Sequence, residues 1–320
     1  MSQKKTAGST IRPGYKSPSV FKQLGRNIKA HPYLYLLFLP VFVYYVIFHY
    51  WPMYGVIIAF KDFKPMKGIF GSEWVGLLQF KTFLSSTFLW RLIRNTLSIN
   101  LGMLIFAFPL PILFALLLNE CKSVAFRKVV QTVTYMPHFV SSVVVCSLML
   151  IFCRSNGILT RMLGTFGVRQ TNLFSVPKYF QPLYILMNIW QELGWESIIF
   201  FAALTSIDAS LYEAAKVDGA GRWQQMWHVT LPGIAPTIVI LLILRIGNLM
   251  SLGWDRIILM YNDMVMETAD VISTFVYRTG LVQVQYSYAT AVGLLNSIIN
   301  VILLVSANAV SRKISDSSLW

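Results

Sequence analysis

The sequence predicts an all-α membrane protein with six transmembrane helices and a cytoplasmic loop between the fourth and the fifth. The 320-residue chain is 56% hydrophobic and only 12% charged, about half the charged fraction of soluble domains. Five long stretches contain no Asp, Glu, Lys or Arg: residues 30–60, 95–119, 129–153, 223–244 and 279–311. Each can hold the ~20 apolar residues that cross a bilayer. A sixth apolar stretch, 182–205, carries only Glu192 and Glu196.

The spans are expected near 33–50, 94–118, 131–153, 182–205, 233–254 and 284–308. At these lengths only helices satisfy every backbone polar group in lipid. A soluble helical bundle is the alternative, but its helices would carry a polar face at 3.6-residue spacing, and these segments are apolar all round. The prediction is therefore a multi-pass protein of the cytoplasmic membrane.

A basic tail, residues 1–29, is expected to precede the membrane domain, residues 30–320. The tail holds seven Lys or Arg and no acid, which favours a cytoplasmic N-terminus. With six spans the C-terminus is cytoplasmic as well. The net charge of +14 is expected to contact the headgroups of the lipid bilayer and not nucleic acid, because no basic module interleaved with aromatic residues occurs.

The loop between the fourth and fifth spans, residues 206–232, has the pattern of a helix, a glycine break and a second short helix. Ser210 and Glu213 form an S-x-x-E capping box that predicts the first helix start. Gly219 and Gly221 interrupt it, and Pro232 is expected to end the second piece. This shape is suited to gripping another protein, and a lipid-facing amphipathic loop is the alternative.

The same loop resembles the EAA loop of binding-protein-dependent ABC importer permeases. The matching residues are Glu213, Ala214, Ala215, Asp218, Gly219, Ala220, Leu231 and Pro232. The resemblance implies that residues 213–232 are the coupling helix, which docks into a cleft of an ATPase subunit. Trp223, Met226 and Trp227 supply an apolar face that could fill such a pocket.

Further motifs resemble permeases of the maltose-type sugar group, in the branch that imports polysaccharides and oligosaccharides. They include Tyr50-x-Pro52-Met53-Tyr54-Gly55, Gly71-Ser72-x-Trp74-Val75-Gly76, Leu116-Leu117-Leu118-Asn119-Glu120 and Gln131 to His138. The resemblance implies three kinds of partner: ABC ATPase subunits, a second homologous permease forming a heterodimer, and an extracellular solute-binding protein.

Charged residues inside the predicted spans indicate a polar path. Glu192 and Arg245 fall near the middle of the fourth and fifth spans, where an ionised group costs at least ~2.5 kcal/mol. Both are expected to face the bundle interior and to be paired. Asn188 and Glu196 lie one helical turn either side of Glu192, and Asn248 continues the face of Arg245.

These polar residues, with Trp254 as a ring for stacking on sugars, are the predicted substrate path. A structural ion pair between Glu192 and Arg245 is an equally weighted alternative, and lipid-interface anchoring is the alternative for the tryptophans.

The chain carries no G-x-x-x-x-G-K-[ST] phosphate loop, so ATP hydrolysis is expected on a separate chain. No catalytic or metal-ligand constellation occurs at useful spacing, and neither a metal nor a cofactor is expected. The predicted function is a permease subunit of an ATP-driven importer of an oligosaccharide or polysaccharide fragment. The alternative is an ion-coupled secondary carrier that uses the pair Glu192 and Arg245.

Overall fold

The computed structural model describes residues 26–167, 169–314 and 318–319. The chain divides into two compact units, one up to Gly55 and one from Val56 onwards, and each is considered by itself. Residues 1–25 of the predicted basic tail lie outside the described residues.

The first unit is helical. It contains α2 (Pro32–Tyr45), a π-helical turn (Val46–Tyr50) and α3 (Trp51–Met53). Together with the 3-10 turn that follows, these form one apolar helical stretch over Pro32–Phe60, which extends beyond the span predicted over 33–50.

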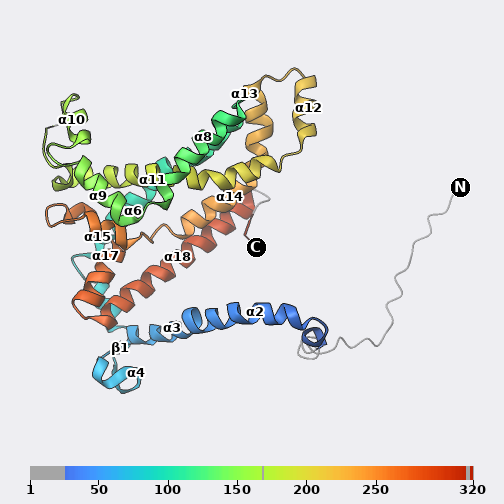
Figure 1. The fold of residues 1–320 in the computed structure, drawn as a ribbon. Coiled ribbons are helices and arrows are strands. Elements are labelled where there is room, and N and C mark those ends of the chain that lie inside the picture. The colour runs from blue at the N-terminus through green and yellow to red at the C-terminus, as the bar shows by residue number, and fades with distance from the viewer. Residues whose placement is uncertain (1–25, 168, 315–317, 320) are drawn as a thin grey trace. The chain divides into compact units, whose positions relative to one another are not determined.

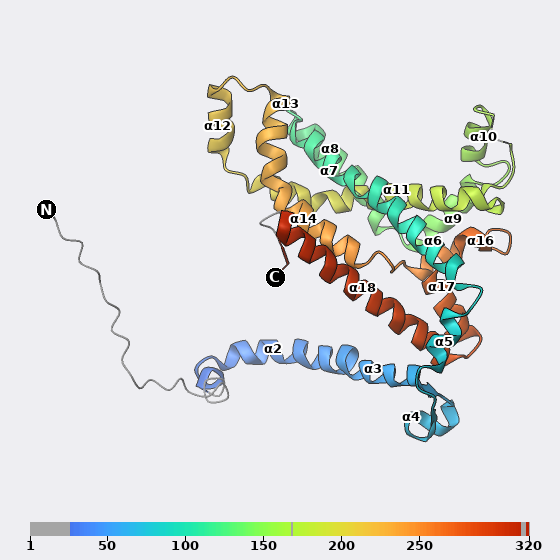
Figure 2. The same cartoon turned by 180° about the vertical axis from the view of Figure 1, so that it is seen from behind.

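The second unit contains fifteen α-helices and two short strands among its described residues (Figures 1 and 2). They are β1 (Lys61–Asp62), α4 (Gly68–Gly71), β2 (Glu73–Trp74), α5 (Leu78–Leu84), α6 (Leu89–Gly102), α7 (Pro109–Asn119), α8 (Val124–Tyr135), α9 (Ser142–Phe152), α10 (Ile158–Gly164), α11 (Pro177–Thr205), α12 (Ala209–Val217), α13 (Arg222–Gln225), α14 (Leu231–Gly247), α15 (Trp254–Met260), α16 (Met266–Ala269), α17 (Ile272–Tyr277) and α18 (Tyr286–Ile314). The strands pair antiparallel, with Lys61 opposite Trp74.

Four helices in the described part of the chain are long and apolar enough to cross a membrane: Pro32–Phe60, Leu89–Asn119, Arg222–Gly247 and Tyr286–Lys313. Two bent pairs raise the number to six if each pair is one span. These are Val124–Phe139 with Ser142–Phe152, and Pro177–Thr205 with Ala209–Val217.

The third span differs from the single helix predicted over 131–153, because it is bent by 98° between its two pieces. The chain leaves α8 through a 3-10 turn containing Pro137, and α9 then starts at a new N-cap, Ser141, whose hydroxyl accepts from the Val144 N–H. A capped helix start in the middle of an apolar stretch ends one helix and begins another.

The fifth span differs at both ends from the prediction over 233–254. It runs unbroken from Arg222 to Gly247, so Pro232 does not end a separate helix. A π-helical turn over Met226–Thr230 directly precedes α14, and Pro232, the second residue of α14, therefore lies inside a continuous helix. Trp254 lies beyond this helix and opens α15.

Helix α11 is the centre of the second unit and packs against α7, α8 and α14. Its buried side chains include Phe180, Tyr184 and Met187, which join the largest apolar cluster. Gly194 lets α8 approach closely, since a Cβ at that position would overlap the backbone of Thr134. Small residues at helix crossings serve this purpose in membrane bundles.

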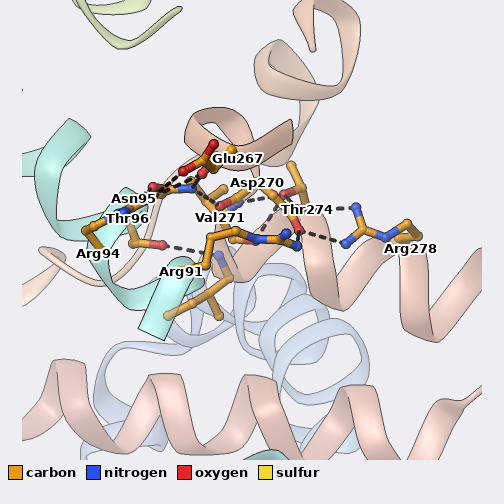
Figure 3. Close-up of polar contacts among 10 residues, drawn as sticks. Arg91, Arg94, Asn95, Thr96, Glu267, Asp270, Val271, Thr274 and Arg278 are labelled. Carbon is orange, nitrogen blue, oxygen red and sulfur yellow. Dashed lines mark hydrogen bonds and ion pairs between the residues drawn. The ribbon is translucent and has the colours of Figure 1, made fainter. Parts of the chain in front are cut away.

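A buried carboxylate fixes the segment between α15 and α18 to α6 (Figure 3). Asp270 is 0% exposed and accepts from Arg91 at 3.1 Å and from Arg278 at 2.8 Å. Asn95 Nδ2 donates to the carbonyl of Asp270 at 2.9 Å, and the Thr274 hydroxyl donates to its carboxylate at 2.9 Å. We call this group the Asp270 clamp. It holds α17 in a fixed position against α6.

Candidate functional site

A cavity of about 620 Å³ lies between the middle of α11 and the C-terminal end of α14. Arg245 is therefore near the end of the fifth span, and the prediction that places it near the middle is wrong. The lining of the cavity contains Phe108, His138, Glu192, Trp195, Glu196, Ile199, Phe200, Leu241, Leu244, Arg245 and Asn248. We call it the charged cavity, because four of these residues are ionisable. The sequence predicted Glu192, Glu196, Arg245 and Asn248 for this path, and the structure brings all four to one space.

Glu192 is held by two partners inside the cavity. Its Oε2 lies 2.7 Å from His138 Nδ1, and its Oε1 accepts from Arg256 Nη2 at 2.8 Å. Arg256 also donates to the Ser142 hydroxyl at 3.4 Å. His138 and Ser142 lie on opposite sides of the break in the third span. Glu192 contacts the first piece directly through His138 and the second piece through Arg256, which bonds to Ser142. Glu192 therefore connects both pieces of that span to α11.

Arg245 forms its ion pair with Glu196. The interpretation in which Glu192 and Arg245 pair with each other is therefore wrong, although each is paired. Glu196 lies one helical turn further along α11, level with Arg245 of α14. The arginine partner of Glu192, Arg256, comes instead from α15, which packs against α9.

Sequence reasoning included neither Arg256 nor His138 in the predicted substrate path. His138 stacks on Trp195, with ring centroids 4.3 Å apart and the planes 1° from parallel. The signal for Arg256 was its position just after an apolar span, but only the fold places it next to a glutamate 64 residues away.

The other two predicted path residues lie outside the cavity lining. Asn188 is partly buried on α11, one turn beyond Glu192. Trp254 stacks on Tyr277 with ring centroids 4.6 Å apart and lines a different pocket.

The loop predicted to contact an ATPase, residues 206–232, which we call the coupling loop, carries α12 and α13 at the end of the unit away from α17 (Figure 1). Asp208, and not Ser210, is the N-cap of α12, and it accepts from the Ser210 N–H at 2.9 Å. That hydrogen bond from the Ser210 backbone lowers the pKa of Asp208. The capping box predicted from Ser210 and Glu213 is wrong, because α12 starts at Ala209, two residues before the start that Ser210 as N-cap would give.

The glycine break in the loop is where the sequence places it. Gly219 has φ +80°, in the left-handed region, and no atom lies within 4 Å of the position of an added Cβ. A side chain there would strain the backbone without touching a neighbour. Glu213 stands exposed on α12 before this turn.

The predicted apolar face of the loop divides into two parts. Trp223 and Trp227 are exposed, at 70% and 60%, whereas Met226 packs on the cluster formed by α7, α11 and α14. The Tyr212 hydroxyl lies 3.0 Å from the Thr230 hydroxyl and ties α12 to the start of the fifth span. The loop therefore presents two large apolar side chains while it is anchored to the bundle.

Residues 107–316 match the family described as binding-protein-dependent transport system inner membrane component. The chain belongs to this family. It is a permease subunit of an ABC importer, a multi-pass inner membrane protein and not itself an enzyme. This membership overturns the alternative of an ion-coupled secondary carrier.

Two relatives from Bacillus subtilis (strain 168) are similar over nearly the whole chain. The polygalacturonan/rhamnogalacturonan transport system permease protein YteP is 45% identical over 300 residues, covering 93% of this chain and 94% of its own. Protein LplB is 43% identical over 294 residues, covering 92% of each chain.

Two solved structures have the same fold. A chain of a bacterial ABC transporter involved in the import of the acidic polysaccharide alginate matches with TM-score 0.83 and 42% identity, over 91% of this chain and 99% of that chain. A chain of the bacterial alginate ABC transporter in complex with alginate pentasaccharide-bound periplasmic protein matches with TM-score 0.84 and 41% identity, over 93% and 100%.

Within the described ranges, no group of three or more His, Cys, Asp or Glu residues is placed to hold a metal ion.

Proposed function

We propose that this permease passes an acidic oligosaccharide through the charged cavity into the cytoplasm, driven by ATPase subunits that grip the coupling loop. The observation that carries the proposal is the position of Arg245, a cation near the end of α14 on the wall of a 620 Å³ cavity. Relatives whose names specify polygalacturonan, rhamnogalacturonan and alginate, all acidic polymers, support this choice of cargo.

Arg245 is the most exposed of the charged groups in the cavity and its pairs. Its side chain is 40% exposed and that of Glu196 is 28% exposed, whereas Arg256 is more buried and already bonded to Glu192 and Ser142. A guanidinium binds a carboxylate through two parallel hydrogen bonds. A uronate carboxylate can therefore replace Glu196 at Arg245 without disturbing the Glu192 pairs.

The coupling loop supplies the motor contact in this proposal. Exposed Trp223 and Trp227 would fill an apolar cleft on the ATPase, and Glu213 would face the same partner, with Ala214, Ala215, Asp218 and Ala220 shaping the turn. The orientation that follows has both termini and the loop in the cytoplasm. A second homologous permease and an extracellular solute-binding protein complete the assembly.

The test uses the transporter reconstituted in liposomes with its neighbouring permease, ATPase subunits and loaded binding protein. Glu213→Ala is expected to abolish binding-protein-stimulated ATP hydrolysis and uptake together, while all subunits insert. The matched control is Glu120→Ala, an exposed glutamate of the other short loop on that side, which should behave as wild type.

Two substitutions of Gly219 form a second part of the experiment, which separates the effect of backbone conformation from the effect of steric contact. Gly219→Asn keeps the left-handed turn, since Asn tolerates positive φ, and Gly219→Val does not. Uptake should survive in the first and be lost in the second. Wild-type coupling in both Glu213→Ala and Gly219→Val, with ATPases bound, would overturn the proposed motor contact and favour a lipid-facing loop.

A further inference from the structure

A second pocket, of about 550 Å³, lies between α17 and α18, at the end of the unit away from the coupling loop (Figure 2). Its walls come from one face of each helix, with Ser273 and Tyr277 on one side and Thr290 and Gly293 on the other. Trp254 closes it from α15. In the proposed orientation this pocket is on the outer side of the membrane domain.

The aromatic side of the pocket is preformed. The rings of Trp254 and Tyr277 stack 12° from parallel, which covers one face of the indole, and Trp254 is still 46% exposed. The Asp270 clamp fixes α17 through Arg278 and Thr274, so Tyr277 is held on a rigid helix. A fixed aromatic ring offers a flat apolar surface at little entropic cost.

The α17 wall of the pocket also carries a serine hydroxyl, one turn before Tyr277. Ser273 Oγ is buried and has no hydrogen-bond partner among the described residues. A buried polar atom without a partner is costly and calls for an explanation. The hydroxyls of Thr290 and Ser297 donate to carbonyls of their own helix, at 2.7 and 2.9 Å, and keep lone pairs that can accept.

Polar side chains continue from this pocket to the charged cavity. One turn beyond Ser297, Asn300 donates to the Ser251 hydroxyl at 2.7 Å. Ser251 in turn lines a small space of about 80 Å³ together with Arg245 and Asn248, and both of these also line the charged cavity. Polar groups that suit a hydroxylated ligand therefore lie between the two large spaces.

We propose that the pocket between α17 and α18 is a sugar-ring subsite, which holds one residue of the cargo while another occupies the charged cavity. The inference rests on the proposed function, because it assumes an oligosaccharide cargo. A pyranose ring has an apolar face to lie on Trp254 and hydroxyls to pair with Ser273. A lipid chain would leave that hydroxyl unpaired, so a sugar fits the pocket better than a lipid chain does.

Gly293 provides a variant that fills the pocket without crowding the fold. No atom lies within 4 Å of an added Cβ at this position, and every non-proline residue favours a helix more than glycine does. Gly293→Phe should block the subsite, and Gly293→Ala is its matched control. The measurement is uptake of galacturonate oligomers of two to six units by the reconstituted transporter.

The expected result is a length-dependent defect. Gly293→Phe should raise the half-saturating concentration for the longest oligomer by about tenfold, the effect of losing one good contact, and leave the dimer unchanged. Ser273→Ala should also raise the half-saturating concentration for the longest oligomer. Thermal stability should not fall, because the hydroxyl has no protein partner to lose among the described residues.

Three results would overturn the subsite. They are equal length dependence in Gly293→Phe and Gly293→Ala, separation of the two permeases in Gly293→Phe during gel filtration, and a phospholipid that copurifies with wild type and is lost from Gly293→Phe. Absence of uptake for every oligomer in the wild type would instead contradict the proposed function itself.

Discussion

Two carboxylate–arginine groups in this permease use the same chemistry with different access to water. In the Asp270 clamp the carboxylate is 0% exposed and contacts two arginines and a threonine. In the charged cavity Glu196 has one ion-pair partner, Arg245, and both side chains reach the open space. A fully enclosed carboxylate with every oxygen in use holds helices together, whereas a half-exposed pair is free to exchange partners.

The distinction follows from the cost of burying charge. An enclosed ion that loses its partner stays in low dielectric and is uncompensated. A pair at a water-filled cavity is partly solvated, so either partner can be released at a smaller cost.

The largest expected effect comes from breaking the clamp. Asp270→Asn leaves Arg91 and Arg278 without a counter-ion, and we expect the free energy of unfolding to fall by about 3–5 kcal/mol. Denaturant unfolding in mixed micelles measures it. Asp263→Asn, an exposed aspartate in the same segment, is the matched control and should change little. A loss below about 1 kcal/mol, which is typical of exposed ion pairs, would mean that the Asp270 clamp stabilises the fold no more than the ion pairs of the charged cavity do.

A smaller effect, on transport, is expected from the cavity pair. Arg245→Gln should reduce uptake of an acidic oligosaccharide by about tenfold to a hundredfold, the value of a charged hydrogen bond. Uptake of the same oligosaccharide with its carboxylates reduced to alcohols should be unchanged. Glu196→Gln removes the competitor of the cargo and should lower the half-saturating concentration for the acidic form.

The direction in which each cavity variant changes uptake distinguishes an ion pair that exchanges partners with the cargo from an ion pair that is purely structural. A purely structural Arg245–Glu196 pair would make Arg245→Gln and Glu196→Gln equally harmful to both cargoes, with a matching loss of thermal stability. Opposite effects on acidic cargo, at unchanged stability, are the result that only exchange explains.

Prediction from the sequence succeeded where the determinants are local. Charge-free stretches located the apolar segments, and the spacing from Glu213 to Pro232 led to the permease family. Partner choice was not local: Glu192 could be recognised as costly in a membrane, but Arg256 reaches it only because α15 packs against α9. Asp270 carried no sequence signal for its role, since its two arginines come from α6 and from one residue beyond α17.

The helix start in the coupling loop shows a limit even for local signals. Asp208 and Ser210 are both good N-caps, and the capping box with Glu213 favoured Ser210. The structure uses Asp208, whose extended backbone, ψ 127°, precedes α12. Asp and Ser are caps of similar strength, so the residue pattern alone does not decide between two candidates two residues apart.

Asp208 is a fully exposed carboxylate, unlike Asp270 in the clamp and Glu196 in the charged cavity. Its substitution is expected to have the smallest effect of the three. Its pKa is lowered in the folded loop by the hydrogen bond from the Ser210 N–H. A depressed folded pKa means that the cap stabilises α12 above the unfolded pKa and loses this contribution as pH falls through the folded value. Hydrogen exchange of the amides of α12 in the purified chain, corrected for intrinsic rates, measures it.

In wild type the protection of α12 should fall several-fold as the pH drops below the ordinary aspartate range. Asp208→Asn, an equally good cap that does not titrate, should keep constant protection over the same range, and Asp208→Ala should be poorly protected throughout. Identical pH profiles for wild type and Asp208→Asn would mean that the charge adds nothing to the cap. Because the effect is confined to one exposed helix turn, global stability should stay constant in all three, in contrast to Asp270→Asn.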